Sequence, residues 1–131
     1  MRKTNSLDFE IGFYEKIVRE KPDYTDALIL LAQAYTTRKQ YRKGLEIDQR
    51  LAKLCPRDPT IFYNLACSYA LLDLERDALD ALEKAVSWGY RDFSYMKRDS
   101  DLKALHANER FQQILQSGLK KQKGKVTEGG V

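Results

Sequence analysis

The fold is decided by two matching stretches of sequence, Ala27–Tyr35 (ALILLAQAY) and Ile61–Tyr69 (IFYNLACSY). They begin 34 residues apart, and residues around them match at the same offset. The matching pairs are Leu31 and Leu65, Ala32 and Ala66, Tyr35 and Tyr69, Leu28 and Phe62, Leu45 and Leu79, Arg42 and Arg76, and Pro22 and Pro56. A fixed period of this length is typical of stacked units, each too small to bury its own apolar face alone.

Apolar residues within each unit recur at helical spacing. One face of residues 25–37 carries Ala27, Leu28, Leu31, Ala32 and Tyr35. Pro22 and Pro56 stop the helices that precede them. Asp58 suits the N-cap of the next helix, with Pro59 at its first position. These signals predict helices over residues 7–20, 25–37, 41–54, 59–71 and 75–88, and a last helix that begins after Asn108 and ends at Gly118.

Small and large residues alternate at fixed positions in the two units. They are Leu31, Ala32, Tyr35, Gly44 and Pro56, then Phe62, Leu65, Ala66, Tyr69, Ala78, Leu82 and Ala85. This set resembles the tetratricopeptide repeat (TPR) family. The resemblance implies complete repeats at residues 25–58 and 59–92 after a half-repeat at 7–22. It also implies an all-α fold, a right-handed superhelical stack of antiparallel helix hairpins (an α-solenoid) with about five main helices plus a C-terminal capping helix.

The period is lost after residue 92. The segment from Gly89 to Leu115 resembles a degenerate ending found on many bacterial TPR proteins, with an aspartate-containing turn at Asp99 and Asp101, and residues 93–118 are the predicted cap. We expect this segment to cap the stack, so that the domain spans residues 1–118. Residues 119–131 have no apolar period and hold four lysines, so we predict a disordered basic tail there.

The TPR resemblance also implies where a partner binds. In that family the first helix of each unit lines the concave face, and helical phase then places ten residues of this sequence there. The predicted groove residues are Asp26, Ile29, Gln33, Thr36, Thr37, Thr60, Tyr63, Asn64, Cys67 and Ala70. Tyr63 and Asn64 suit peptide binding best, because a tyrosine offers apolar area with a polar tip and an asparagine can both donate and accept hydrogen bonds. The alternative is that Tyr63 only covers a neighbouring helix and that Asn64 only bonds a neighbouring residue.

Residues typical of catalysis or metal binding do not occur in a recognisable pattern. His106 is the only histidine, and the isolated Cys55 and Cys67 favour two free thiols. The sequence has no zinc-ligand spacing, no glycine-rich phosphate loop and no nucleophile with an evident base. We therefore expect no enzyme activity, no metal ion and no cofactor.

Charge and hydropathy limit the location and the partners. The net charge is +4, and the lysines of residues 120–125 account for the excess. Because this excess lies outside the predicted domain, a nucleic-acid partner is disfavoured. No run of about 18 apolar residues is present, and the first ten residues lack the apolar core of a signal peptide. We therefore expect no membrane span and a cytoplasmic location.

Stacks of this kind usually present a surface that holds a partner. We therefore predict a protein–protein interaction module, an adaptor or scaffold that binds a peptide or protein segment on its concave face. Association with RNA or an anionic surface is an alternative, through basic segments at Arg38–Lys43 and Lys120–Lys125.

A second alternative is a self-assembling structural element. The half-repeat at the start lacks its first helix, which is expected to leave Phe9, Phe13 and Tyr14 partly exposed. An uncovered aromatic edge favours pairing with a second copy of the chain, so a homodimer is possible through this edge.

Overall fold

The computed structural model describes the backbone of residues 3–129 and the side chains of residues 6–122. Seven α-helices and one 3-10 helix occur in these residues, and no strand is found among them. In chain order they are α1 (Lys3–Glu20), α2 (Thr25–Thr37), α3 (Tyr41–Leu54), α4 (Pro59–Leu71), α5 (Glu75–Ser87), α6 (Phe93–Arg98), η1 (Ser100–Leu105) and α7 (Glu109–Gly129). The predicted all-α fold is therefore confirmed.

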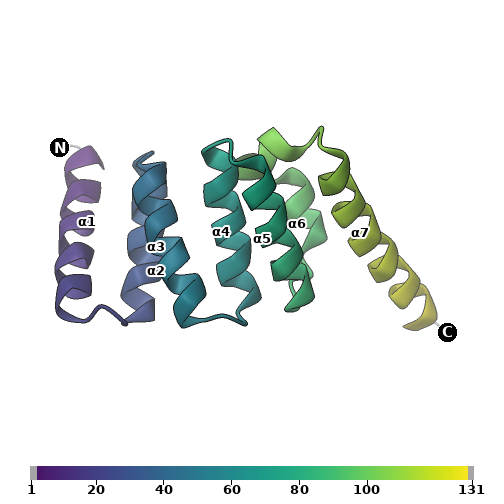
Figure 1. The fold of residues 1–131 in the computed structure, drawn as a ribbon, viewed down its shortest axis with the longest axis horizontal. Coiled ribbons are helices and arrows are strands. Elements are labelled where there is room, and N and C mark those ends of the chain that lie inside the picture. Colours follow the sequence, from purple (N-terminus) through teal and green to yellow (C-terminus); the bar gives the residue numbers. More distant parts are fainter. Residues whose placement is uncertain (1–2, 130–131) are drawn as a thin grey trace.

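The helices stand side by side in one row, with the two chain ends at opposite ends of it (Figure 1). α2 and α3 form the first hairpin, and α4 and α5 form the second. α1 precedes these hairpins, and α6, η1 and α7 follow α5. This is the arrangement of a helical-repeat stack, in which each unit contacts only its neighbours.

The turns of the two hairpins have the same backbone conformation. Lys39 and Asp73 occupy equivalent positions 34 residues apart, and their φ angles are 64° and 59°. The residue after each donates its backbone N–H to the carbonyl of an equivalent tyrosine, at 2.8 Å from Gln40 to Tyr35 and at 2.9 Å in the second unit. Positive φ is uncommon for residues other than glycine, so this shared geometry supports reading the units as copies of one hairpin.

Buried apolar side chains form two clusters that share helices. Leu28, Leu31 and Leu51 are fully buried in the cluster formed mainly by α1, α2 and α3. The second cluster joins α4 and α5 to the C-terminal segment. Leu45 of α3 belongs to the second cluster and Ile61 of α4 to the first. Neighbouring units therefore share their apolar core, which is what allows short hairpins to be stable together.

The predicted starts of two helices are confirmed by side-chain caps. The Asp58 carboxylate accepts the backbone N–H of Thr60 at 2.9 Å and that of Ile61 at 3.3 Å at the start of α4. The Asn108 side chain accepts the backbone N–H of Phe111 at 3.1 Å at the start of α7. Such caps satisfy N–H groups that have no partner within the helix.

Two predicted helix boundaries are wrong. α1 begins at Lys3 rather than at residue 7, because the polar residues before Leu7 contain no helix breaker and simply continue the helix. α7 does not end at Gly118 but continues to Gly129. Residues 119–129, predicted to be a disordered tail, are therefore helical, and residues 130–131 of that tail lie outside the described residues.

Gly118 has a packing role instead of a stop role. A Cβ atom added to Gly118 would lie only 2.3 Å from the ring of Phe93, which is 2% exposed. The absence of a side chain thus allows α7 to approach the buried ring of α6. A glycine stop requires a left-handed conformation, whereas Gly118 remains within the helix.

We expect Gly118→Ala to lower the free energy of unfolding by roughly 1–3 kcal/mol, because the new methyl group overpacks the contact with Phe93. The matched control is Gly12→Ala on the exposed side of α1, where an added Cβ meets no atom within 4 Å. The free energy of unfolding of the Gly12→Ala control should rise by up to about 1 kcal/mol, because alanine has the higher helix propensity. Urea denaturation of both variants measures the difference, and equal stabilisation of both would contradict the packing role.

Candidate interaction groove

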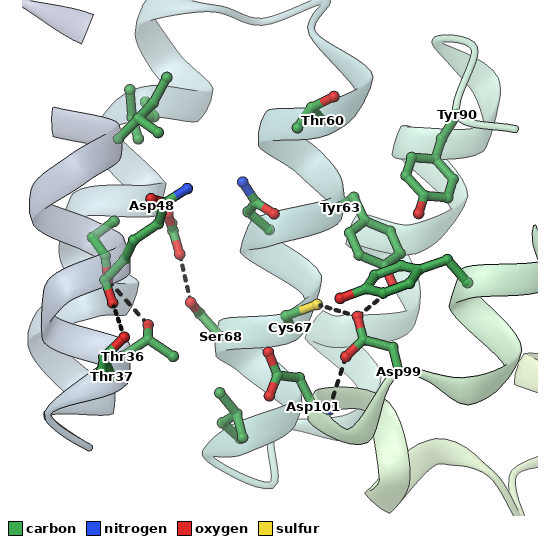
Figure 2. Close-up of a pocket in the computed structure, with 17 residues that line it drawn as sticks. Thr36, Thr37, Asp48, Thr60, Tyr63, Cys67, Ser68, Tyr90, Asp99 and Asp101 are labelled. Carbon is green, nitrogen blue, oxygen red and sulfur yellow. Dashed lines mark hydrogen bonds between the residues drawn. The ribbon is translucent and has the colours of Figure 1, made fainter. Parts of the chain in front are cut away.

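An open groove of about 560 Å³ lies against α2 and α4, the first helices of the two hairpins (Figure 2). α2 forms one wall, α4 lies in the middle, and residues 90–101 form the opposite wall. α3 contributes Asp48 and Leu51. The groove therefore spans both hairpins and ends at the C-terminal cap.

Most of the predicted groove residues line this one cavity. Those that do are Ile29, Gln33, Thr36, Thr37, Thr60, Tyr63, Asn64 and Cys67. Asp26, which is exposed in the first turn of α2, and the buried Ala70 of α4 are not among the lining residues. Six further polar or aromatic residues of the lining were not expected from the sequence, namely Asp48, Ser68, Tyr90, Tyr95, Asp99 and Asp101.

Tyr63 is held by the cap and is not free to meet a partner. Its side chain is 4% exposed, and its hydroxyl donates a hydrogen bond to Asp99 Oδ2 at 2.6 Å. Its ring stacks on that of Tyr90, with centroids 4.3 Å apart and planes 2° from parallel. Burial and the bond to Asp99 raise the pKa of Tyr63 well above its ordinary value. Tyr63 therefore ties α4 to residues 90–101 (Figure 2).

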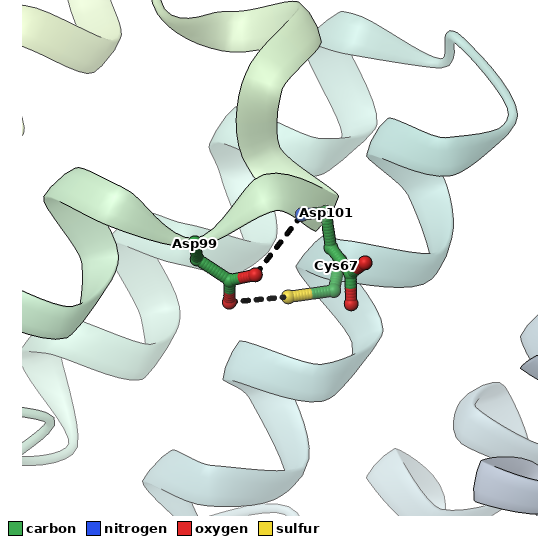
Figure 3. Close-up of side chains that lie close together, drawn as sticks. All are labelled: Cys67, Asp99 and Asp101. Carbon is green, nitrogen blue, oxygen red and sulfur yellow. Dashed lines mark hydrogen bonds between the residues drawn. The ribbon is translucent and has the colours of Figure 1, made fainter. Parts of the chain in front are cut away.

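Asp99 accepts hydrogen bonds from three groups at the edge of the groove, the Tyr63 hydroxyl, the Cys67 thiol and the Asp101 backbone N–H. Figure 3 shows the last two. Asp99 caps η1 by accepting the backbone N–H of Asp101 at 3.0 Å, and its other oxygen accepts the Cys67 thiol at 3.7 Å. Burial, followed by the charge of Asp99, raises the pKa of the Cys67 thiol. A thiol that keeps its proton is a poor nucleophile.

The Cys67, Asp99 and Asp101 side chains also have the spacing of possible metal ligands. Their sulfur and oxygen atoms lie within 4.8 Å of one another. However, the thiol acts as a hydrogen-bond donor here, and both oxygens of Asp99 already accept bonds from Tyr63 and from the protein backbone. A metal ion would have to replace these bonds, so the geometry is better described as a hydrogen-bonded cap.

Asp48 is a buried carboxyl in the groove. It is 4% exposed and accepts a hydrogen bond from the Ser68 hydroxyl of α4 (Figure 2). Burial raises the pKa of Asp48 to about 6, although the bond from Ser68 lowers it. One signal in the sequence could have revealed this site, because Asp48 lies at helical spacing between the inward-facing Leu45 and Leu51, where an apolar residue is expected.

The lining of the groove carries charge of one sign. Asp48, Asp99 and Asp101 contribute carboxyl groups, and the described residues that line the groove include no lysine, arginine or histidine. Burial, and then the neighbouring Asp99, raise the pKa of Asp101 above its ordinary value. These carboxyl groups are thus not neutralised by a basic side chain among the lining residues.

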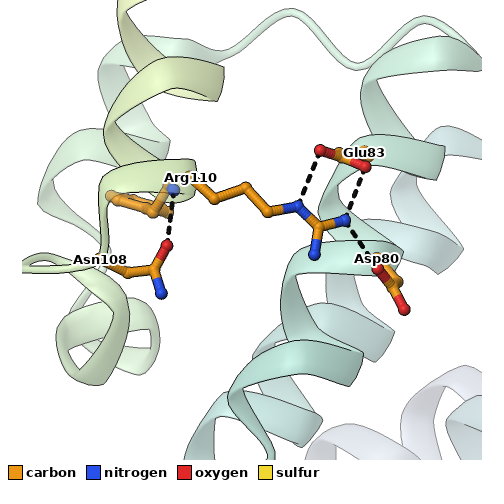
Figure 4. A network of polar contacts seen from close by, with 5 residues as sticks. Asp80, Glu83, Asn108 and Arg110 are labelled. Carbon is orange, nitrogen blue, oxygen red and sulfur yellow. Dashed lines mark hydrogen bonds and ion pairs between the residues drawn. The ribbon is translucent and has the colours of Figure 1, made fainter.

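A separate polar network ties α7 to α5 outside the groove (Figure 4). The Arg110 guanidinium lies 2.7 Å from Glu83 Oε1 and 2.6 Å from Asp80 Oδ1. The pair with Glu83 is bidentate, which favours a defined geometry. These acidic residues of α5 therefore position the cap and are not part of the groove.

A row of helical hairpins with a groove along their first helices defines a TPR-like α-solenoid. The chain is similar to the crystal structure of MamA, with a TM-score of 0.64 and 17% sequence identity. The similarity covers 96% of this chain and 94% of that chain. At this identity the likeness shows the fold, and the predicted α-solenoid is thereby confirmed.

A curated relative is similar in sequence to part of the chain. This chloroplastic protein of Arabidopsis thaliana is 33% identical over 79 residues, which is 58% of this chain and 24% of the relative. The chain thus matches about a quarter of that protein's length. No protein-family model matches the chain. None of the helices in the described residues is both long and apolar enough to cross a membrane, and the cytoplasmic location stays a prediction.

We expect Asp48→Asn to stabilise the protein at pH 7 and to change its stability little at pH 4. The pKa of Asp48 is about 6 in the folded chain against an ordinary 3.8, so the folded state binds this proton more tightly. The stabilisation that this tighter proton binding gives the wild type is complete below about pH 4 and is lost as the pH rises through about 6. At about 1.4 kcal/mol per unit of pKa difference, the gain at pH 7 reaches up to about 3 kcal/mol.

Urea denaturation of wild type and variant at pH 4, 5, 6 and 7 measures this difference. Asparagine can still accept the bond from Ser68, so the packing is preserved. Asp77→Asn on the exposed side of α5 is the matched control. A difference between wild type and Asp48→Asn that stays constant from pH 4 to pH 7 would contradict the assignment.

Proposed function

We propose that this chain is a protein–protein interaction module that holds an extended segment of a partner protein in the groove between α2, α4 and the cap. The observation that carries the proposal is that one open cavity collects Gln33 and Asn64, polar side chains of the two first helices, together with apolar surface from Ile29 and Leu71. A bound polypeptide needs hydrogen-bond partners for its backbone and apolar area for its side chains. The TPR-like fold supports an interaction role in general.

Gln33 and Asn64 are the residues of this groove best suited to bind a partner. Gln33 is exposed and Asn64 is half-buried. Each side-chain amide can donate and accept hydrogen bonds with an extended backbone. Tyr63 supports this wall indirectly, because its bond to Asp99 fixes the cap that limits the groove.

The alternative of RNA or anionic-surface association has weaker support. The two basic segments of the sequence belong to the α2–α3 turn and to α7, with α4 and α5 between them (Figure 1). Arg38 of the first segment pairs with Asp8 of α1 at 3.0 Å. The groove itself is lined by carboxyl groups, which repel phosphates.

Self-association through α1 is a second candidate function that one observation favours. Phe9 is 74% exposed and Phe13 is 53% exposed, and they lie four residues apart on one face of the helix. Tyr14, the third residue of the predicted edge, instead packs partly against the first apolar cluster. Two exposed phenylalanines on one face of α1 suit a contact with the same face of a second copy.

We expect Gln33→Arg to abolish the capture of the partner, because a longer cationic side chain occupies the groove wall of α2. The matched control is Gln113→Arg on the exposed surface of α7. Affinity capture from cell extract with quantitative mass spectrometry compares wild type and both variants. Proteins retained by wild type and by the control but lost from Gln33→Arg support the proposal, whereas identical capture by all three would sink it.

We expect the apparent mass of the wild-type chain to rise with concentration in sedimentation velocity, and that of the double variant Phe9→Ser with Phe13→Ser to stay monomeric. The reason is the loss of the exposed aromatic area of α1. Leu30→Ser, another exposed apolar residue, serves as the control. A wild-type chain that remains monomeric at its highest soluble concentration rules out this edge as an interface.

A further inference from the structure

Resting on the proposed groove function, we infer that the partner segment is basic and that one of its lysine or arginine side chains binds between the carboxylates of Asp99 and Asp101 and the rings of Tyr90 and Tyr95. This inference concerns the chemistry of the partner, which the fold alone does not determine. It follows from the charge, the spacing and the aromatic surface of one end of the groove.

The spacing of the two carboxylates suits a single cation. Oxygen atoms of Asp99 and Asp101 lie within 4.8 Å of each other (Figure 3). Asp99 Oδ1 accepts one bond, from the Asp101 N–H, and so keeps one acceptor site; an ammonium or guanidinium group placed there can bond to Oδ1 and to the Asp101 carboxylate without replacing the bonds from Tyr63 and Cys67. Asp101 contributes its backbone N–H to the cap, and its carboxylate is half-buried at the groove. The cap thus holds the pair in place before any partner arrives.

No basic side chain of the described lining compensates the charge at this end of the groove; Arg98, outside the lining, lies with its guanidinium 5.8 Å from the centroid of the Tyr95 ring. Asp99 and Asp101 are neighbours of the same sign, Asp48 adds a third carboxyl along the groove, and no basic residue lies among the described lining residues. Like charges in a partly buried site repel one another more strongly than they do in water. The raised pKa of Asp101, caused by burial and then by Asp99, is consistent with this repulsion. A bound cation relieves it, whereas an acidic segment increases it.

Aromatic rings complete the site for a cationic side chain. Tyr90 and Tyr95 both line the groove, and Tyr95 is 43% exposed. The Tyr90 ring is fixed by its stacking on Tyr63, and the Tyr95 ring lies tilted to Tyr63 with centroids 6.2 Å apart. Aromatic faces attract cations, and the methylene stem of a lysine or arginine also gains apolar contact there.

The test is a selection of twelve-residue peptides from a random display library on the full wild-type chain, in low-salt buffer that contains EDTA. We expect the selected peptides to be enriched in lysine and arginine. Titration calorimetry then measures one selected peptide and its Lys→Gln version against wild type and Asp101→Asn. Replacing either the peptide lysine or Asp101 should weaken binding on the order of tenfold. Replacing both should weaken binding by less than the product of the two separate effects.

Matched controls separate this inference from the proposed function. Asp77→Asn, an exposed carboxyl of α5 outside the groove, should leave the affinity within about twofold of wild type. The basic-segment inference would be overturned if the selected peptides were neutral or acidic, failed to bind Gln33→Arg and bound Asp101→Asn as tightly as wild type. That result would still support the groove as the binding site. Peptides that bind Gln33→Arg as well as wild type, or a library that yields none, would instead overturn the groove function itself.

Discussion

The stack depends on the burial of α4 on nearly every side. Ile61 contributes to the first apolar cluster, while Phe62 and Ala66 belong to the second. The remaining side of α4 carries polar atoms of Tyr63 and Ser68, which are themselves buried. Buried hydroxyl groups need hydrogen-bond partners, and the acceptors come from other elements, from the start of η1 for Tyr63 and from α3 for Ser68. One helix therefore joins the preceding unit, its own hairpin partner and the cap.

The need of the buried hydroxyl groups of α4 for hydrogen-bond acceptors explains why carboxyl groups lie at the groove. Asp48 and Asp99 each accept a hydrogen bond from a hydroxyl group of α4, and both are buried in doing so. A buried carboxyl is costly in its charged form, which is why the pKa of Asp48 is raised to about 6. The groove is therefore lined by carboxyl groups because these groups accept the hydrogen bonds that hold the stack together.

The repeat period predicted the parts of the molecule that depend on local sequence. It located the hairpins and the apolar faces, because helical phase determines which side chains share a face. Together with the TPR resemblance, which implies that the first helices line the concave face, it also gave eight residues that line the groove. It missed the contacts between distant residues that do not follow the period. Tyr63 and Asp99 are 36 residues apart in sequence and Asp48 and Ser68 are 20 apart. The predicted helix stop at Gly118 was wrong for a related reason, because the packing role of this glycine depends on the ring of Phe93 in another helix.

The end of the repeat and the formation of the groove have a common cause at Tyr90. This residue occupies the position that Pro22 and Pro56 occupy in the earlier units. Its backbone N–H donates to the carbonyl of Ala85 at 2.9 Å, a bond that a proline cannot make. Its ring then stacks on that of Tyr63 in α4. The loss of the proline therefore marks the point where the chain turns across α4, and this turn makes the wall that gives the groove its aromatic and acidic end.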